Sequence, residues 1–192
     1  MTPNPIEAVV IGASAGAVQA LLEILPALPD AYPLPILIVV HVPPDRASAL
    51  PDLFAARCRL PVKEAEDKEV VLPGLVYFAP ADYHLLVEHG RSLALSVDDP
   101  VNYSRPAIDV LFESAADAFG PALAGIVLTG ANHDGAAGLK AIAQVGGLAI
   151  VEDPASAASA TMPAAALVAC PTAQVLDLPG IIDFMQRLAG RD

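Results

Sequence analysis

The run Ile36–Val40 is the feature that most constrains the fold of this chain. Its residues, Ile-Leu-Ile-Val-Val, are all apolar, so a strand built from them has no face suited to water. A strand that is apolar on both faces is typical of a parallel sheet covered by helices on both sides. Similar short apolar runs occur at Ala8–Ile11, Gly125–Leu128 and Leu148–Val151.

The segments between these runs carry apolar residues at helical spacing. We expect helices over residues 18–25, 49–57, 106–119 (with Pro106 in the first turn), 135–145 and 179–188, a short helix after Pro163, and further short strands over 70–72 and 75–78. Residues 85–87 and 93–95 flank His89-Gly90 and predict a hairpin. The sequence therefore predicts one domain over residues 1–192, a three-layer α/β/α, doubly wound, mostly parallel sheet with a small antiparallel hairpin excursion.

The charge balance argues against two classes of partner. Ten Lys and Arg against 22 Asp and Glu give a formal net charge of −12, which repels nucleic-acid phosphate and anionic lipid. One basic cluster is interpreted as a solvated face paired with neighbouring carboxylates; it comprises Arg46, Arg57, Arg59, Lys63 and Lys68, with Glu64, Glu66, Asp67 and Glu69 beside it.

Cysteine usage and hydropathy favour a cytoplasmic protein without a bound metal. Cys58 and Cys170 lack metal-ligand spacing and are expected to be buried, reduced thiols. The N-terminal segment does not read as a signal peptide, and the apolar runs are too short to cross a bilayer, so no membrane insertion is expected. No cofactor is expected either.

Three reactive residues follow ends of predicted strands, where ligands bind in open α/β sheets. The first is Ser14, inside Gly12-Ala13-Ser14-Ala15-Gly16. This G-x-S-x-G pattern allows a sharp strand-to-helix turn that exposes a serine hydroxyl as a nucleophile. The alternative is a serine N-cap in an ordinary turn.

Dinucleotide binding is a rival interpretation of the same turn. Gly12, Ser14 and Ala17 occupy the three positions of G-x-G-x-x-[G/A], but serine replaces the middle glycine. The acidic residue expected at the end of the second strand is absent as well, because His41 stands there. Both departures weaken this interpretation.

His41 and Asp134 are the other two residues. His41 can take a proton from Ser14, because side chains at neighbouring strand ends lie within reach of each other. Asp134 can orient the imidazole and stabilise its protonated form. The alternatives are a histidine bonded to loop backbone and an aspartate that serves as a turn or helix N-cap residue. His133 is a second candidate base, although a neighbour of Asp134 in a tight loop is expected to point away from it.

The chain order of these residues excludes the common lipases and esterases. Those α/β-hydrolases carry several strands before the serine turn and follow the order serine, acid, histidine. In this chain the serine follows the first strand and the order is Ser14, His41, Asp134.

From Ile11 to about Pro171 the sequence resembles the catalytic domain of the chemotaxis receptor methylesterases of CheB type. The matching landmarks are Ile11–Ser14, His41 with Pro43, Val62–Ala65, Pro73-Gly74, Tyr77–Pro80, His84, Arg105-Pro106, Asp109–Phe112, Leu128–Gly130, Asp134–Ala136 and Met162-Pro163. The resemblance implies a catalytic triad of Ser14, His41 and Asp134, with backbone N–H groups near Ala15 and Ala131 binding the oxyanion. It also implies hydrolysis of γ-glutamyl methyl esters on the cytoplasmic helices of methyl-accepting chemoreceptors, and deamidation of some receptor glutamines.

The chain departs from the family pattern in two loops. It has Ser14-Ala15-Gly16-Ala17 where the family usually reads Ser-Thr-Gly-Gly, and Thr129-Gly130-Ala131-Asn132 where the family usually reads Thr-Gly-Met-Gly; Thr161 also replaces a usual glycine. The sequence holds no counterpart of the phosphoacceptor receiver domain common in the family, so it is either a stand-alone paralogue or a piece of a longer protein, and a separate response regulator is a candidate partner. The alternative hypothesis is a catalytically weakened CheB-like paralogue that acts as a binding or regulatory domain.

Overall fold

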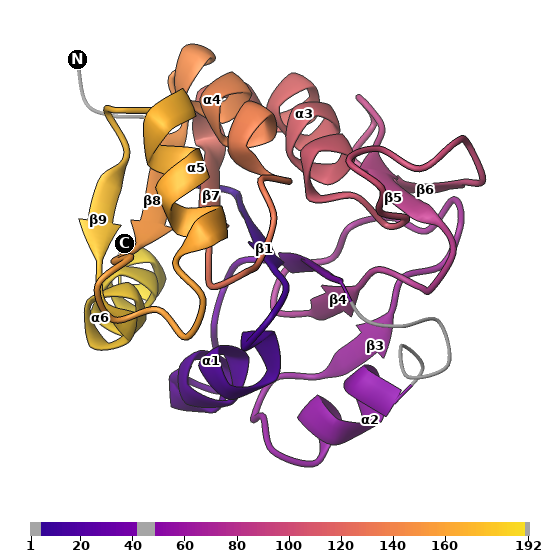
Figure 1. Cartoon of the computed structure of the whole chain (residues 1–192). Helices are drawn as coiled ribbons and strands as arrows, with labels where there is room; N and C mark the ends of the chain where they lie inside the picture. The colour runs from indigo at the N-terminus through magenta and orange to yellow at the C-terminus, as the bar shows by residue number, and fades with distance from the viewer. Residues whose placement is uncertain (1–4, 42–48, 191–192) are drawn as a thin grey trace.

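The computed structural model describes residues 5–41 and 49–190. Its main sheet has seven parallel strands in the order β3-β4-β2-β1-β7-β8-β9 (Figure 1). The strands are β1 (Ala8–Ala13), β2 (Ile36–Val40), β3 (Val62–Glu64), β4 (Val76–Phe78), β7 (Leu123–Val127), β8 (Leu148–Glu152) and β9 (Gln174–Leu176). A separate antiparallel pair consists of β5 (His84–Val87) and β6 (Leu93–Ser96).

Helices cover both faces of the sheet (Figure 1). The helices are α1 (Ala17–Ile24), α2 (Ala49–Ala55), α3 (Ile108–Phe119), α4 (Ala136–Gln144), α5 (Thr161–Ala169) and α6 (Leu178–Ala189). Side chains of α1, α2 and α6 share one hydrophobic core with Val9 and Ile11 of β1, whereas those of α3, α4 and α5 share the other with Ala8 and Val10. This alternation along one strand is the three-layer α/β/α arrangement that the sequence predicts.

The central strands are buried on both faces, as their apolar sequences predict. Every residue of β1, β2 and β7 is buried, because each of these strands has a neighbour on both edges and helices on both faces. The antiparallel hairpin at β5 and β6 is confirmed as well.

The sheet has its topological switch point at β1. From β1 the chain first adds strands on the β2 side and then crosses to β7 on the other side. The segment after β1 enters α1 on one face, and the segment after β7 enters α4 on the opposite face. The carboxyl ends of two strands whose following loops diverge in this way are the usual ligand site of such sheets.

Several local predictions are wrong. Residues 70–72 do not form a strand, and only Val70 makes an isolated bridge, to Ser92. Helix α3 begins at Ile108 rather than in a turn containing Pro106, because the carboxylate of Asp134 binds the N–H groups of its first two residues. Helix α5 begins at Thr161, ahead of Pro163. The edge strands β3 and β9 were not predicted.

The charge and cysteine predictions are confirmed in part. Lys63 pairs with Glu66 at 2.7 Å and with Glu69 at 2.8 Å, as predicted. Lys68 pairs instead with Glu88, which lies outside the predicted cluster in the sequence. Arg46 lies outside the described residues. Both cysteines are free; Cys170 is buried, whereas Cys58 is only half-buried. Within the described ranges, no helix is long and apolar enough to cross a membrane, and no group of three or more metal-ligating side chains gathers.

Candidate active site

Ser14 lies directly after β1, in a tight turn that leads into α1. Its N–H donates to the carbonyl of Thr129 at 2.9 Å, and its own carbonyl accepts from Ala17 N–H at 2.9 Å. Gly16 has φ of 87°, and a Cβ there would lie 2.8 Å from that of Ala158, so both backbone and space require glycine. The turn leaves Ser14 partly exposed at the switch point.

His41 is the neighbour of Ser14 on the next strand. Ala13 pairs with Val40 in the register of β1 and β2, and the N–H of His41 donates to the carbonyl of Ala13 at 3.1 Å. Parallel strands lie about 4.8 Å apart, and residues at matching positions project to the same face. The register therefore places Ser14 and His41 next to each other just past the two strand ends. No hydrogen bond joins the Ser14 hydroxyl to the His41 ring, whose two nitrogens contact Asp134 and Asn132.

Asp134 lies in the loop after β7, and its side chain is fully buried. Nε2 of His41 lies 2.8 Å from Oδ2 of Asp134. The carboxylate has four further donors, which are Asn102 Nδ2 at 2.9 Å and the N–H groups of Ile108 at 2.6 Å, Asp109 at 3.1 Å and Gly135 at 3.1 Å. Asp134 thus caps α3 from another loop; the interpretation as a cap of its own helix is wrong, since Gly135 occupies the N-cap of α4 without a side-chain bond.

These contacts keep Asp134 ionised despite its burial. Burial alone raises the pKa of this carboxyl, but the hydrogen bonds from His41, Asn102 and the start of α3 outweigh it and hold the pKa below its ordinary value. The N-terminus of α3 also carries partial positive charge, which favours the anion. The site therefore presents a fixed negative charge to the histidine ring.

Sequence reasoning did not place Asn102 or Asp109 in this site. Asn102 donates from Nδ2 to Asp134 and also to Oδ2 of Asp109 at 2.8 Å, and Oδ1 of Asp109 accepts from Gly138 N–H at 2.7 Å. Burial raises the pKa of Asp109 above its ordinary value, and the nearby charge of Asp134 adds to the rise. No spacing signal could have found Asn102, because it meets Asp134 from a loop 32 residues away.

Asn132 contacts the other nitrogen of the histidine ring. Its Nδ2 lies 3.3 Å from Nδ1 of His41, and its Oδ1 accepts from the N–H of Asp134 at 3.1 Å. With Nε2 directed at Asp134, Nδ1 is the ring nitrogen left for the hydroxyl of Ser14. Among the described residues, that hydroxyl has no hydrogen-bond partner.

Ala15 and Ala131 are the two residues whose backbone N–H groups are predicted to bind the oxyanion. Ala15 and Ala131 are exposed, and within residues 5–41 and 49–190 neither N–H donates a hydrogen bond. Thr129 braces both loops, since its Oγ1 donates to the carbonyl of Ala15 at 2.8 Å and its N–H donates to Oε2 of the buried Glu152 at 2.7 Å. With no acceptor among the described residues, the N–H groups of Ala15 and Ala131 are therefore free to bind a ligand.

The remaining histidines take no part in this arrangement. His84 is buried, accepts from Ala107 N–H at Nδ1 and lies 3.1 Å from the carbonyl of Asp99 at Nε2, so it supports the segment that leads into α3. His133 and His89 are exposed. The expectation that His133 points away from Asp134 agrees with that exposure.

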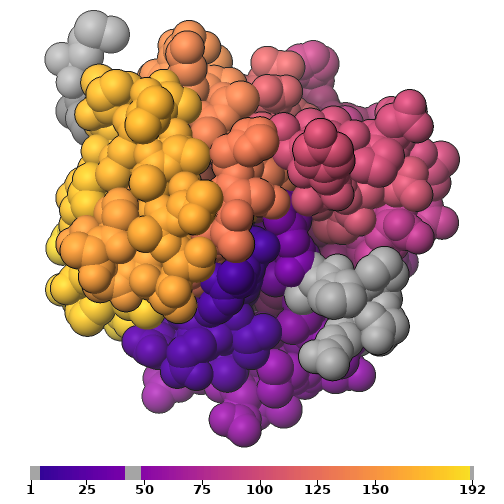
Figure 2. All heavy atoms as spheres, viewed as in Figure 1, coloured from indigo at the N-terminus to yellow at the C-terminus, as the bar shows by residue number. Residues whose placement is uncertain are grey.

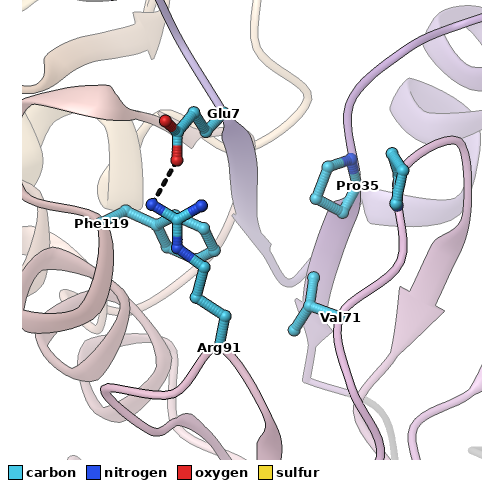
Figure 3. Close-up of a pocket in the computed structure, with 6 residues that line it drawn as sticks. Glu7, Pro35, Val71, Arg91 and Phe119 are labelled. Atoms are coloured by element: carbon cyan, nitrogen blue, oxygen red, sulfur yellow. Dashed lines mark ion pairs between the residues drawn. The ribbon is translucent and has the colours of Figure 1, made fainter.

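The space-filling view shows the segments of the site together on one face. Indigo atoms of the β1–α1 segment lie beside orange atoms of the β7–α4 segment near the centre of the view (Figure 2). A cavity of about 210 Å³ lies elsewhere, at the amino ends of the strands, between Glu7 and Pro35 (Figure 3). There Arg91 pairs with Glu7 and lies 5.0 Å from the ring centroid of Phe119. This cavity contains none of the candidate catalytic residues.

Comparisons with known proteins agree on one family. The family model described as CheB methylesterase matches residues 9–185. A candidate protein-glutamate methylesterase/protein-glutamine glutaminase of Leptospira interrogans is 45% identical over 182 residues, covering 95% of this chain and 94% of that relative. The protein-glutamate methylesterase/protein-glutamine glutaminase of Salmonella typhi is 39% identical over 180 residues, which is 92% of this chain but 51% of that relative.

A solved structure gives the same result. The crystal structure of the Thermotoga maritima CheB methylesterase catalytic domain matches with a TM-score of 0.90 and 34% sequence identity. The match covers 95% of this chain and 98% of that one.

Proposed function

Because the chain belongs to the CheB methylesterase family, we propose that it is a protein-glutamate methylesterase and protein-glutamine glutaminase with Ser14 as its nucleophile. In this proposal His41 is the general base, and Asp134 orients and stabilises it. The observation that carries the assignment is the 2.8 Å contact between His41 Nε2 and Asp134 Oδ2, beside Ser14 on the neighbouring strand end.

The first half of the reaction forms an acyl-enzyme. Nδ1 of His41 takes the proton of the Ser14 hydroxyl as Oγ attacks the carbonyl carbon of a γ-glutamyl methyl ester. The oxyanion receives hydrogen bonds from the N–H groups of Ala15 and Ala131. The charge on Asp134 stabilises the imidazolium that forms at His41.

Collapse of the tetrahedral intermediate breaks the bond to the methoxy group and completes the first half; hydrolysis of the acyl-enzyme, which frees the glutamate carboxylate, is the second half. His41 gives its proton to the departing methoxy oxygen, so methanol leaves and the glutamyl group stays on Ser14. Water then loses a proton to His41 and attacks the acyl carbon, and the returning proton restores the Ser14 hydroxyl. A glutamine side chain follows the same course, with ammonia in place of methanol.

The proposed substrates are the cytoplasmic helices of methyl-accepting chemoreceptors, which puts the reaction in the cytoplasm. A separate response regulator is the proposed partner. The names of the relatives support protein glutamate and glutamine side chains as the groups acted on, and the partly exposed position of Ser14 suits an ester carried on a macromolecule.

A second candidate function is a binding or regulatory domain with weakened catalysis. One observation favours it: the amide of Asn132 lies at the ring nitrogen that the reaction needs. The two functions differ in whether Ser14 turns over an ester.

Methanol release from purified methylated receptor tests the proposed function. We expect the wild-type chain to release methanol and Ser14→Ala to release none above background, since losing the nucleophile costs several orders of magnitude in kcat. Release that is unaffected by Ser14→Ala would contradict the assignment. Receptor capture without release would favour the second candidate.

A further inference from the structure

The amide group of Asn132 has only one orientation that satisfies both of its contacts. Its oxygen Oδ1 must accept from the N–H of Asp134, because a backbone N–H can only donate. The nitrogen Nδ2 is therefore the atom at Nδ1 of His41, and it can only donate.

This orientation determines the protonation of the histidine ring. Nδ1 must be unprotonated, since it accepts from the Asn132 amide. The ring proton of neutral His41 is then on Nε2, where it is donated to Oδ2 of Asp134. The lone pair of Nδ1 is the one that the proton of Ser14 needs, and Asn132 already uses it.

We propose that Asn132 restrains the reaction by occupying Nδ1 of His41 in the free protein, so that its amide must withdraw before Ser14 can be activated. This inference rests on the proposed function, because it takes Nδ1 as the acceptor of the Ser14 proton. It assigns to Asn132 a competing role rather than a catalytic one.

The Asn132 amide has two effects on His41: it favours the ring proton on Nε2, and it occupies the lone pair of Nδ1. Another group supplies only the first effect. Asp134 also favours the proton on Nε2, through a shorter contact that involves a charged group, so loss of Asn132 leaves the tautomer in place. Nothing else compensates for the competition at Nδ1. Removal of the amide should therefore accelerate the attack by Ser14.

The contact is weak enough to be broken as substrate binds. Its length of 3.3 Å is beyond the usual range for a strong N–H donor. Asn132 also directly follows Ala131, a proposed oxyanion donor whose N–H makes no hydrogen bond to any residue that the structure describes. A substrate carbonyl that binds there therefore arrives next to the restraining amide.

Asn132→Ser is the most informative variant. A serine hydroxyl can still accept from the N–H two residues later and so keep the turn, but it is too short to reach His41. The readout is the second-order rate of labelling of Ser14 by a fluorophosphonate probe. We expect Asn132→Ser and Asn132→Ala to react about 2- to 10-fold faster than wild type, the effect of losing one neutral hydrogen bond. His133→Ser, in the same loop and exposed, is the matched control with an unchanged rate.

Nitrogen NMR of His41 gives an independent readout. In the neutral wild-type protein Nδ1 should resonate as an unprotonated, hydrogen-bonded nitrogen, and in Asn132→Ser it should move towards a free unprotonated one. Unchanged or slower labelling in both variants, or a proton on Nδ1 of wild type, would overturn the inference and leave the proposed function standing. Failure of every form to react with the probe would instead count against the proposed function, while the NMR signal would still report the contact.

Discussion

Asn102 holds Asp134 from the tip of a tight turn, with 2.9 Å between Nδ2 of the amide and Oδ1 of the carboxylate. Val101 and Ser104 exchange backbone hydrogen bonds across this turn, and Asn102 has φ of 51°, in the left-handed region. Asparagine tolerates that region better than most residues. Its side chain and its backbone conformation therefore both suit this position.

Two substitutions at this position separate the amide from the backbone. Asn102→Gly removes the amide and keeps the positive φ, so we expect a loss of about 1.5–3 kcal/mol in the free energy of unfolding, the range for hydrogen bonds to charged groups. Asn102→Ala adds the cost of a left-handed alanine, about 1–2 kcal/mol more. Urea unfolding measures both values. Equal stability of the two variants would contradict this account of the turn.

Gly138 of α4 packs closely against α3. A Cβ there would lie 2.5 Å from Cβ of Phe112 and 3.2 Å from the backbone of Asp109. Although alanine favours a helix by about 1 kcal/mol, overpacking should dominate. Gly138→Ala is expected to lower the free energy of unfolding by about 1–3 kcal/mol. Because Gly138 also donates to Asp109, methanol release should fall as well.

Gly90→Ala is the matched control, because nothing lies within 4 Å of a Cβ at that exposed position. Its unfolding midpoint should stay near that of wild type or rise slightly. If both alanine variants unfolded like wild type, the proposed close packing of α3 on α4 would be wrong.

Glu152 makes stability depend on pH. Burial raises the pKa of this carboxyl above its ordinary value of 4.5, although the N–H of Thr129 partly opposes the rise. The unfolded chain therefore loses this proton at a lower pH than the folded protein does, so the contribution of Glu152 to stability falls as pH rises from 4.5 through the raised pKa. Below 4.5 both states are protonated and this cost vanishes.

Glu152→Gln should remove that cost while its amide oxygen still accepts from Thr129. The difference in free energy of unfolding, variant minus wild type, is expected to grow in the variant's favour between pH 4.5 and neutral pH. Urea titrations at several pH values measure it. A difference that stays constant, or that shrinks with rising pH, would show that ionisation of Glu152 does not destabilise the folded protein.

The parts of the fold that the sequence predicts are those whose pattern is strong within a short segment. Ile36–Val40 is apolar throughout because β2 is central, and its position made the next residue, His41, a candidate. By contrast, β3 and β9 have three residues each, lie at the two edges and include polar or exposed positions, so their patterns resemble loops.

The candidate site divides in the same way. Ser14, His41 and Asp134 follow strand ends, which sequence reasoning can find. Asn102 could not be found, because it reaches Asp134 from a turn 32 residues away in the sequence. Asn132 was visible only as a departure from the family pattern. Its contact with the histidine ring could be recognised only from the positions of Nδ1 of His41 and of the N–H of Asp134.

Covalent labelling mapped by mass spectrometry tests the central claim, that His41 and Asp134 activate Ser14. The wild-type chain should incorporate one fluorophosphonate per molecule on the peptide that contains Ser14. Ser14→Ala should incorporate none, and Asp134→Asn should react about three to four orders of magnitude more slowly, as expected for loss of the carboxylate that orients the base. Absence of label on wild-type Ser14, or labelling at an unchanged rate in Asp134→Asn, would contradict the account.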